Sequence, residues 1–143
     1  MLEFSADIYQ TECAAVLIYA PKSLLMLCYQ KNPVTFINIF DGFLLITVSE
    51  GMTMTLLESM NIGLPCIVTN LGGNTEVCAH EQTGFVLGTH NLAQQTKAVG
   101  SLANSPAKTK AFSEAVVAVF NEKFTQQQMN QQYQRCYTSA FKK

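Results

Sequence analysis

Two glutamates, Glu50 and Glu58, have the chemistry and the spacing to bind a polar ligand. Glu50 directly follows an apolar run at 43–48 that predicts a buried β-strand, and Glu58 lies on a short amphipathic helix predicted over 53–61. The amides at such a helix start are unpaired and the helix dipole is positive there, which suits a phosphate. Carboxylates beside that anion site can accept hydrogen bonds from sugar hydroxyls. The spacing therefore favours a site for a phosphorylated sugar ligand.

Each glutamate also has a structural explanation to set against the functional one. The sequence Thr55-Leu56-Leu57-Glu58 fits a capping box, in which the glutamate simply bonds back to a backbone amide. Packing explains Glu50 poorly, because a charged carboxylate between a buried strand and Gly51 does not contribute to an apolar core. We take Glu50 as the catalytic candidate and Glu58 as a ligand-binding candidate, with the capping alternative left open.

The other candidates would contribute backbone groups. Gly51 allows a ligand to approach the main chain or simply makes a turn. Gly72 and Gly73 follow the next predicted strand, where close approach of a ligand competes with a plain turn. Three amides at the helix start could cradle a phosphate without any side-chain signature, those of Met54, Thr55 and Leu56.

The composition narrows the class of protein. The chain has 143 residues with 48% hydrophobic and only 13% charged residues, and its net charge is −1. Because Arg135 is the single arginine and the lysines are scattered, no basic face is predicted and nucleic acid is not an expected partner. So few charges suggest that part of the surface is covered by something else. His80 and His90 lack acidic or cysteine partners at ligand spacing, so we expect no metal and no cofactor.

The cysteines and the first residues bear on the compartment. The five cysteines are odd in number and lack any C-x-x-C pair, which favours buried free thiols in a reducing compartment. The apolar region at 14–29 is broken by Pro21 and Lys22 and follows acidic residues, which argues against a signal peptide or a spanning helix. We expect a cytoplasmic protein and leave peripheral contact with a membrane open.

Strands and helices alternate along most of the chain. Strands are predicted at 34–38, 43–48, 66–69 and 84–87, with short helices at 53–61 and 74–78, the second capped by Asn74. Three longer helices follow, one after Asn91, one at 108–120 and one after Thr125. The apolar stripe of the last helix is predicted to be buried and consists of Met129, Tyr133, Cys136, Tyr137 and Ala140.

Such alternation predicts an α/β fold, a Rossmann-like parallel sheet flanked by helices in a single domain at 33–143. Residues 1–32 form a poorly matched N-terminal segment. In open parallel sheets the ligand crevice lies outside the carboxyl ends of the strands. Glu50 follows one strand end and the stretch 70–73 follows the next, so two segments should converge on one edge of the sheet.

The stretch 38–141 resembles the C-terminal, donor-binding domain of group 1 glycosyltransferases, glycosyltransferase family 4, which have the GT-B fold. The matching motifs are FLLITVSEG, LLESMNIGLPCIVTNLGGNTEV, TGFVL around Gly84, and a closing helix that ends near Tyr137. The resemblance implies one half of a GT-B fold, with the C-terminal helix extending away to pack on a partner domain.

The resemblance also implies an activity. It would be transfer of a hexose-type sugar from a nucleotide-sugar, with retention at the anomeric carbon and no metal. The glutamate matching Glu50 would contact the donor sugar, the one matching Glu58 would hold the ribose, and the backbone at 51–56 would meet sugar and phosphates. A GT-B enzyme needs two such domains, so a missing N-terminal acceptor domain or a partner chain is implied.

The chain departs from the family pattern in two places that matter. No arginine precedes Glu50, although the family neutralises the donor diphosphate with a basic pair upstream, and Thr53 and Met54 stand where proline is common. We therefore expect the chain to be the donor-binding half of a retaining glycosyltransferase, a fragment or one part of a split enzyme, inactive alone. The alternative is a non-catalytic remnant that acts as an interaction module. A receiver-like signalling domain would share the sheet but lacks the acidic pocket.

Overall fold

A computed structural model describes residues 31–49, 51 and 53–141, and it divides the chain into two units, 1–33 and 34–143. Glu50 and Met52 lie outside the described residues. The second unit contains, in order, α2 (Val34–Ile37), β1 (Phe43–Leu45), α3 (Met54–Ile62), β2 (Cys66–Thr69), α4 (Asn74–Val77), β3 (Gly84–Leu87), α5 (Leu92–Ala103), α6 (Pro106–Lys123) and α7 (Gln126–Ala140).

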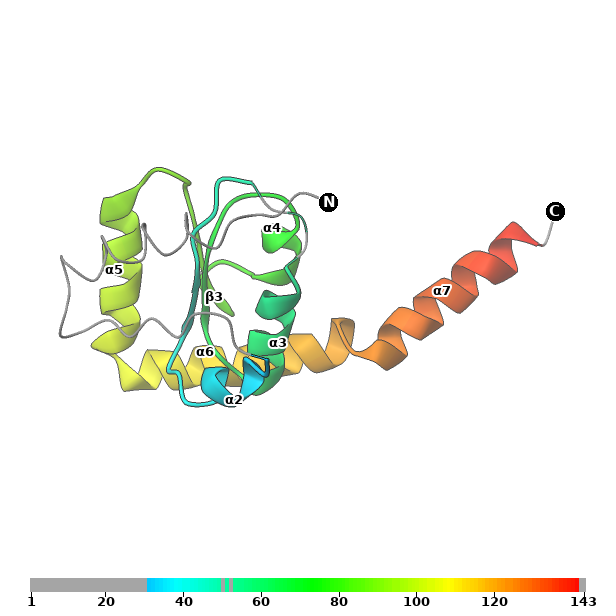
Figure 1. The fold of residues 1–143 in the computed structure, drawn as a ribbon, viewed down its shortest axis with the longest axis horizontal. Helices are drawn as coiled ribbons and strands as arrows, with labels where there is room; N and C mark the ends of the chain where they lie inside the picture. Colours follow the sequence, from blue (N-terminus) through cyan, green and yellow to red (C-terminus); the bar gives the residue numbers. More distant parts are fainter. Residues whose placement is uncertain (1–30, 50, 52, 142–143) are drawn as a thin grey trace. The chain divides into compact units, whose positions relative to one another are not determined.

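The three strands form a parallel sheet in the order β1-β2-β3 (Figure 1). Leu44 pairs with Ile67, and Val68 pairs with Val86. Parallel neighbours need a crossover, and here α3 links β1 to β2 while α4 links β2 to β3. The predicted α/β class with a parallel sheet flanked by helices is confirmed.

The core lies on both faces of the sheet, because successive residues of β2 point to opposite sides. Cys66 and Val68 pack with α3 and α6, whereas Ile67 packs with α5. Figure 1 shows α3 and α5 on opposite sides of the strands. All four residues of β2 are buried, as the continuous apolar run predicts for a central parallel strand.

Two of the five cysteines belong to this core. Burial raises the pKa of the Cys66 thiol far above its usual range, and the neighbouring Cys78 raises it further. Burial also raises the pKa of Cys78, and a hydrogen bond from Thr83 partly opposes that shift. Both are free thiols held in the protonated form, and Cys136 is free and exposed. Cys13 and Cys28 lie outside the described residues.

Two elements differ from the sequence prediction. The predicted strand at 34–38 is the helix α2, which begins directly after Pro33, and proline favours a helix start. The strand predicted at 43–48 ends at Leu45 and is not buried on both faces, since Leu44 is 52% exposed. Within the described residues β1 is an edge strand, so no further strand pairs along its outer side.

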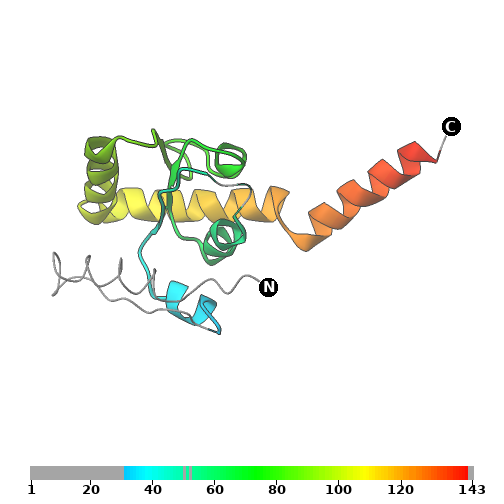
Figure 2. The same cartoon turned by 45° about the horizontal axis from the view of Figure 1, so that its top comes forward.

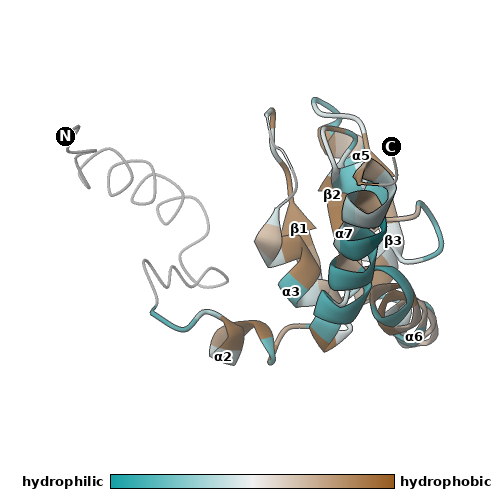
Figure 3. Ribbon diagram, turned by 90° about the vertical axis from the view of Figure 1, so that its right-hand side faces the viewer, coloured by the Kyte–Doolittle hydropathy of each residue, from teal (hydrophilic) through white to brown (hydrophobic). Residues whose placement is uncertain are grey.

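The last helix is where predicted and observed burial differ most. α7 continues from the end of α6 and extends away from the sheet (Figure 2). Met129, Tyr133 and Tyr137 keep the predicted helical spacing but are exposed, and α7 has no buried residue. Figure 3 shows α7 as largely hydrophilic, whereas the strands β1 and β2 are largely hydrophobic. The predicted extension of this helix is confirmed and the predicted burial of its stripe is wrong.

Helix starts in this unit use side-chain caps, with one notable exception among the longer helices. Asn91 accepts from the Gln94 amide, and the cap residues of α6 and α7 accept in the same way from the third helical residue. The N-cap of α3 is Thr53, and its side chain makes no capping bond. Asn74 was predicted to cap α4 and does not, because it is the first residue within that helix.

Gly63 closes α3 in the left-handed region, with φ of 89°, and its amide donates to the Met60 and Ser59 carbonyls. We expect Gly63→Ala to lower the free energy of unfolding by about 1–2 kcal/mol, because L-residues are strained at this φ. The added Cβ would also lie 3.0 Å from Val117 Cγ2 on α6. Urea unfolding of both proteins measures the difference. An unchanged midpoint would contradict the expectation.

Candidate functional site

Side-chain hydrogen bonds continue the pairing of β1 and β2 past their last ladder residues. The Thr69 hydroxyl donates to the Thr47 carbonyl oxygen (3.0 Å), and the Thr47 amide donates to the same hydroxyl (3.2 Å). Thr69 is fully buried. This pair fixes the segment that leaves β1 toward the predicted site at the carboxyl edge of the sheet.

The two loops predicted to converge do so through a backbone bond. The Gly73 amide donates to the Gly51 carbonyl oxygen at 3.1 Å. Gly72 precedes it with φ of 50°, a conformation that favours glycine. Both glycines of this turn and Gly51 therefore lie at one edge, beyond β1 and β2.

The start of α3 offers unpaired donors at this edge. The Thr53 carbonyl oxygen already accepts from the amides of Leu56 (3.1 Å) and Leu57 (3.4 Å). The amides of Met54 and Thr55 have no hydrogen-bond acceptor among the described residues. The Met54 side chain is 66% exposed, so solvent reaches this helix start, whereas Leu56 is fully buried. Two of the three predicted amides thus have no partner among the described residues, and amides at a helix start are suited to bind an anion.

Glu58 lies on α3, half-buried. The capping box is not formed, because the helix begins at Met54 and Thr53 is its N-cap, which places Thr55 inside the helix. That removes the structural explanation weighed against a ligand-binding role for Glu58. The orientation of Glu58 toward Glu50 stays a prediction, because Glu50 lies outside the described residues.

Two polar atoms at this edge were not predicted to matter. Thr53 Oγ1 and Asn74 Oδ1 are buried and have no hydrogen-bond partner in the described structure. Asn74 Nδ2 donates to the Thr69 carbonyl oxygen (3.2 Å), which anchors α4 to the end of β2. A buried polar atom without a partner costs stability, so such atoms call for an explanation.

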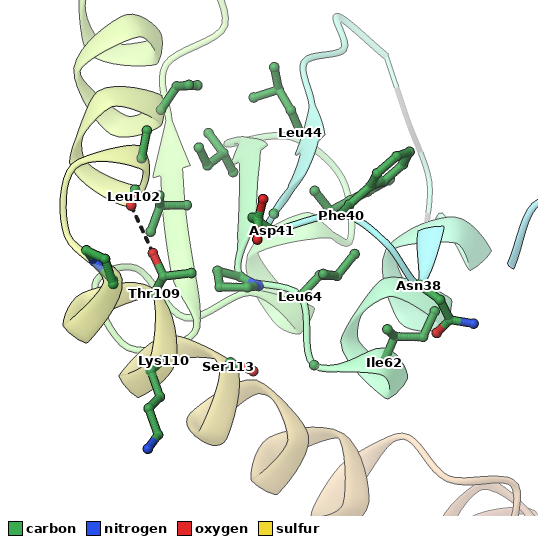
Figure 4. Close-up of a pocket in the computed structure, with 18 residues that line it drawn as sticks. Asn38, Phe40, Asp41, Leu44, Ile62, Leu64, Leu102, Thr109, Lys110 and Ser113 are labelled. Carbon is green, nitrogen blue, oxygen red and sulfur yellow. Dashed lines mark hydrogen bonds between the residues drawn. The ribbon is translucent and has the colours of Figure 1, made fainter. Parts of the chain in front are cut away.

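A cavity of about 860 Å³ lies elsewhere. It is formed by the loop before β1, the end of α3, the end of α5 and the start of α6, as Figure 4 shows. The Thr109 hydroxyl closes one side by donating to the Leu102 carbonyl oxygen (3.0 Å). Phe43 begins β1 and Pro65 precedes β2, so the cavity is at the amino ends of the strands. None of the predicted site residues lines it.

Within the described ranges, no group of three or more His, Cys, Asp or Glu side chains could hold a metal ion. No helix in this part of the chain is long and apolar enough to cross a lipid bilayer.

Sequence comparisons relate this chain to a known family. The family model for glycosyl transferases group 1 matches residues 13–117. The chain is 36% identical over 66 residues to the UDP-Gal:alpha-D-GlcNAc-diphosphoundecaprenol alpha-1,3-galactosyltransferase of Escherichia coli, a match that covers 46% of this chain and 17% of that enzyme. It is 24% identical to the O-antigen biosynthesis glycosyltransferase WclY of Escherichia coli, over 80% of this chain and 31% of WclY. The chain therefore spans less than a third of these relatives.

Solved structures share the fold. Anabaena HepE in complex with UDP-glucose superposes with a TM-score of 0.83 at 17% identity, over 95% of this chain and 38% of HepE. The C-terminal domain of a group 1 glycosyl transferase, LpcC of Francisella tularensis, superposes with a TM-score of 0.70 at 13% identity, over 83% of this chain and 64% of that domain. A parallel sheet of this topology and a family model that matches most of its length make this chain a member of the group 1 glycosyltransferases, with the fold of their C-terminal domain.

Proposed function

We propose that this chain binds a nucleotide-sugar at the carboxyl edge of its sheet and serves as the donor-binding half of a retaining glycosyltransferase. The sugar transferred is of the hexose type and the acceptor is unknown. The acceptor-binding half is supplied by the rest of a longer protein or by a partner chain.

One observation carries the proposal, the bond between Gly73 and Gly51. It joins the loops after β1 and β2 beside the open amides of Met54 and Thr55, and an anion is stabilised where unpaired helix amides and the positive end of the dipole coincide. Two relatives support the ligand class. The Escherichia coli galactosyltransferase uses UDP-Gal, and HepE was solved with UDP-glucose.

The residues have separate roles in this proposal. The diphosphate is held by the helix amides, and Glu58 accepts hydrogen bonds from the ribose hydroxyls. Glu50 contacts the donor sugar and is the candidate catalytic group. The Gly72-Gly73 turn leaves room beside the ligand, because neither residue carries a side chain.

The isolated chain should bind its donor weakly. Each charge-assisted hydrogen bond to a phosphate is worth about 1.5–3 kcal/mol, and the basic pair of the family has no convincing counterpart before Glu50. Loss of two such bonds corresponds to roughly two to four orders of magnitude in affinity. A method that detects millimolar binding is therefore needed.

Titration of the ¹⁵N-labelled chain with UDP-glucose, GDP-mannose and ADP-glucose tests the proposal. We expect at least one of them to shift the amide resonances of Gly51, Met54, Thr55 and Gly73. Amides that line the distant cavity, such as that of Lys110, should stay in place and serve as the internal control. An absence of shifts at the four amides at millimolar ligand would refute the proposal.

A separate observation supports a second candidate function, that of an interaction module. α7 exposes Met129, Tyr133 and Tyr137 along one face, and β1 exposes Leu44, so this domain presents apolar surface that another protein could cover. A non-catalytic interaction module would have the same surfaces. Sugar transfer from a radiolabelled donor by the chain, alone or with an added acceptor domain, would exclude that reading.

A further inference from the structure

We propose that Thr69 is a positioning residue of the donor site, because it holds both of the loops that form the site. The inference rests on the proposed function and concerns a residue that is itself fully buried. Thr69 is the last residue of β2, and its hydroxyl and its carbonyl oxygen bond to different loops.

The Thr69 hydroxyl holds the loop that leaves β1. The ladder between β1 and β2 ends at Leu45, yet Thr47 stays attached, because the hydroxyl accepts from its amide (3.2 Å) and donates to its carbonyl oxygen (3.0 Å). One hydroxyl thus does for Thr47 what the backbone of a neighbouring strand does for a ladder residue. The Thr47 hydroxyl in turn accepts from the Ser49 amide (3.3 Å) and donates to the Ser49 carbonyl oxygen (3.0 Å), which extends the order toward Gly51.

The Thr69 carbonyl oxygen holds the second loop, the one that follows β2. It accepts from the Leu71 amide (2.8 Å) and from Asn74 Nδ2 (3.2 Å), and Asn74 is fully buried at the start of α4. The two glycines of the turn lie between these residues, so both ends of the turn are tied to Thr69. The two loops then meet in the bond from the Gly73 amide to the Gly51 carbonyl oxygen (3.1 Å).

A hydroxyl at the end of β2 calls for a reason. The strand is central and fully buried, its other residues are Cys66, Ile67 and Val68, and a valine would match the shape of Thr69 without a polar atom. Burial of a hydroxyl is unfavourable unless it is hydrogen-bonded, and here both bonds go to Thr47. What threonine adds over valine is therefore the placement of the loop after β1. A site whose loops are placed before the ligand arrives binds it more tightly.

The test compares Thr69→Val and Thr69→Ser with the wild-type chain. The donor probe is whichever of UDP-glucose, GDP-mannose and ADP-glucose the wild-type chain binds most tightly. Valine keeps the shape and removes the hydroxyl, whereas serine keeps the hydroxyl and removes a buried methyl group. We expect the Kd for the donor probe to rise about tenfold in Thr69→Val and to stay at the wild-type value in Thr69→Ser, although both variants lower the Tm. Affinity would then follow the hydroxyl rather than the stability.

Thr83→Val is the matched control, because Thr83 is a second buried threonine and lies at the opposite, amino ends of the strands. Its hydroxyl accepts from the Ala79 amide at 2.9 Å. This variant should lower the Tm as Thr69→Val does and leave the Kd for the donor probe unchanged. If Thr69→Val also keeps the wild-type Kd while its Tm falls, the inference is overturned and Thr69 serves stability alone.

A measurement without ligand separates this inference from the proposed function. Hydrogen exchange of the Gly73 amide reports on its bond to Gly51. We expect this exchange to be about tenfold faster in Thr69→Val than in Thr83→Val, and equal rates would contradict a positioning role. Failure of the wild-type chain to bind any of the three nucleotide-sugars would refute the proposed function, and the exchange of Gly73 would still decide whether Thr69 holds the two loops together.

Discussion

Gly84→Ala is expected to lower the free energy of unfolding by about 3 kcal/mol or more. Gly84 begins β3 and pairs with Cys66 of β2. A Cβ at this position would overlap the Cys66 carbonyl oxygen and lie 2.8 Å from the backbone nitrogen and carbon of the same residue. Because these are backbone atoms of a buried central strand, no side chain can move aside, and the β2–β3 pairing must shift.

Thermal unfolding followed by circular dichroism measures the effect, and a fall in Tm on the order of 10 °C or more corresponds to such a loss. Two glycines of the same region serve as controls. The Cβ of Gly88→Ala would approach nothing closer than 4.0 Å, and Gly100 lies within α5, where alanine is the better helix former by about 0.5–1 kcal/mol. Gly88→Ala should be neutral and Gly100→Ala neutral to stabilising. Equal Tm values for all three variants would contradict the close approach at Gly84.

The strands β2 and β3 could be predicted to the residue, because each is a short apolar run bounded by Gly or Pro signals. The stretch 34–38 could not, since its β-branched residues favour a strand while Pro33 favours a helix start, and the structure has the helix α2 there. For α7 the predicted helix is confirmed, and the predicted burial of its apolar stripe is wrong. An apolar stripe shows that a helix has a face suited to packing, and only a partner surface within the same fold buries it.

The candidate site could likewise be predicted only in part from the sequence. Topology alone brought Gly51 and Gly73 together, because the carboxyl ends of parallel strands share one edge, and the hydrogen bond between the two residues agrees with that prediction. The capping box around Thr55 is a local pattern that the helix start overrides by two residues. The unpaired atoms of Thr53 and Asn74 depend on packing between distant segments, so no local pattern in the sequence reveals them.

Glu58→Gln is expected to raise the Kd of the chain for UDP and for UDP-glucose by about tenfold or more. The amide keeps the size of the carboxylate and removes its charge, and hydrogen bonds from ribose hydroxyls to a charged acceptor are worth about 1.5–3 kcal/mol. Because Glu58 makes no capping box, the substitution should leave the free energy of unfolding within about 0.5 kcal/mol of wild type. The affinity loss would then be separate from any folding defect.

Glu50→Gln distinguishes the proposed role of Glu50, contact with the donor sugar, from that of Glu58, binding of the ribose. A carboxylate that contacts the donor sugar should matter for UDP-glucose and little for UDP, so the ratio of the two Kd values should change in Glu50→Gln and stay constant in Glu58→Gln. Glu114→Gln is the matched control, since Glu114 is 71% exposed on α6 and 4.0 Å from Lys110 in a weak surface pair. If Glu58→Gln binds both ligands as tightly as Glu114→Gln does, Glu58 does not bind the ribose. The geometry of the helix amides would then have to account for the whole affinity.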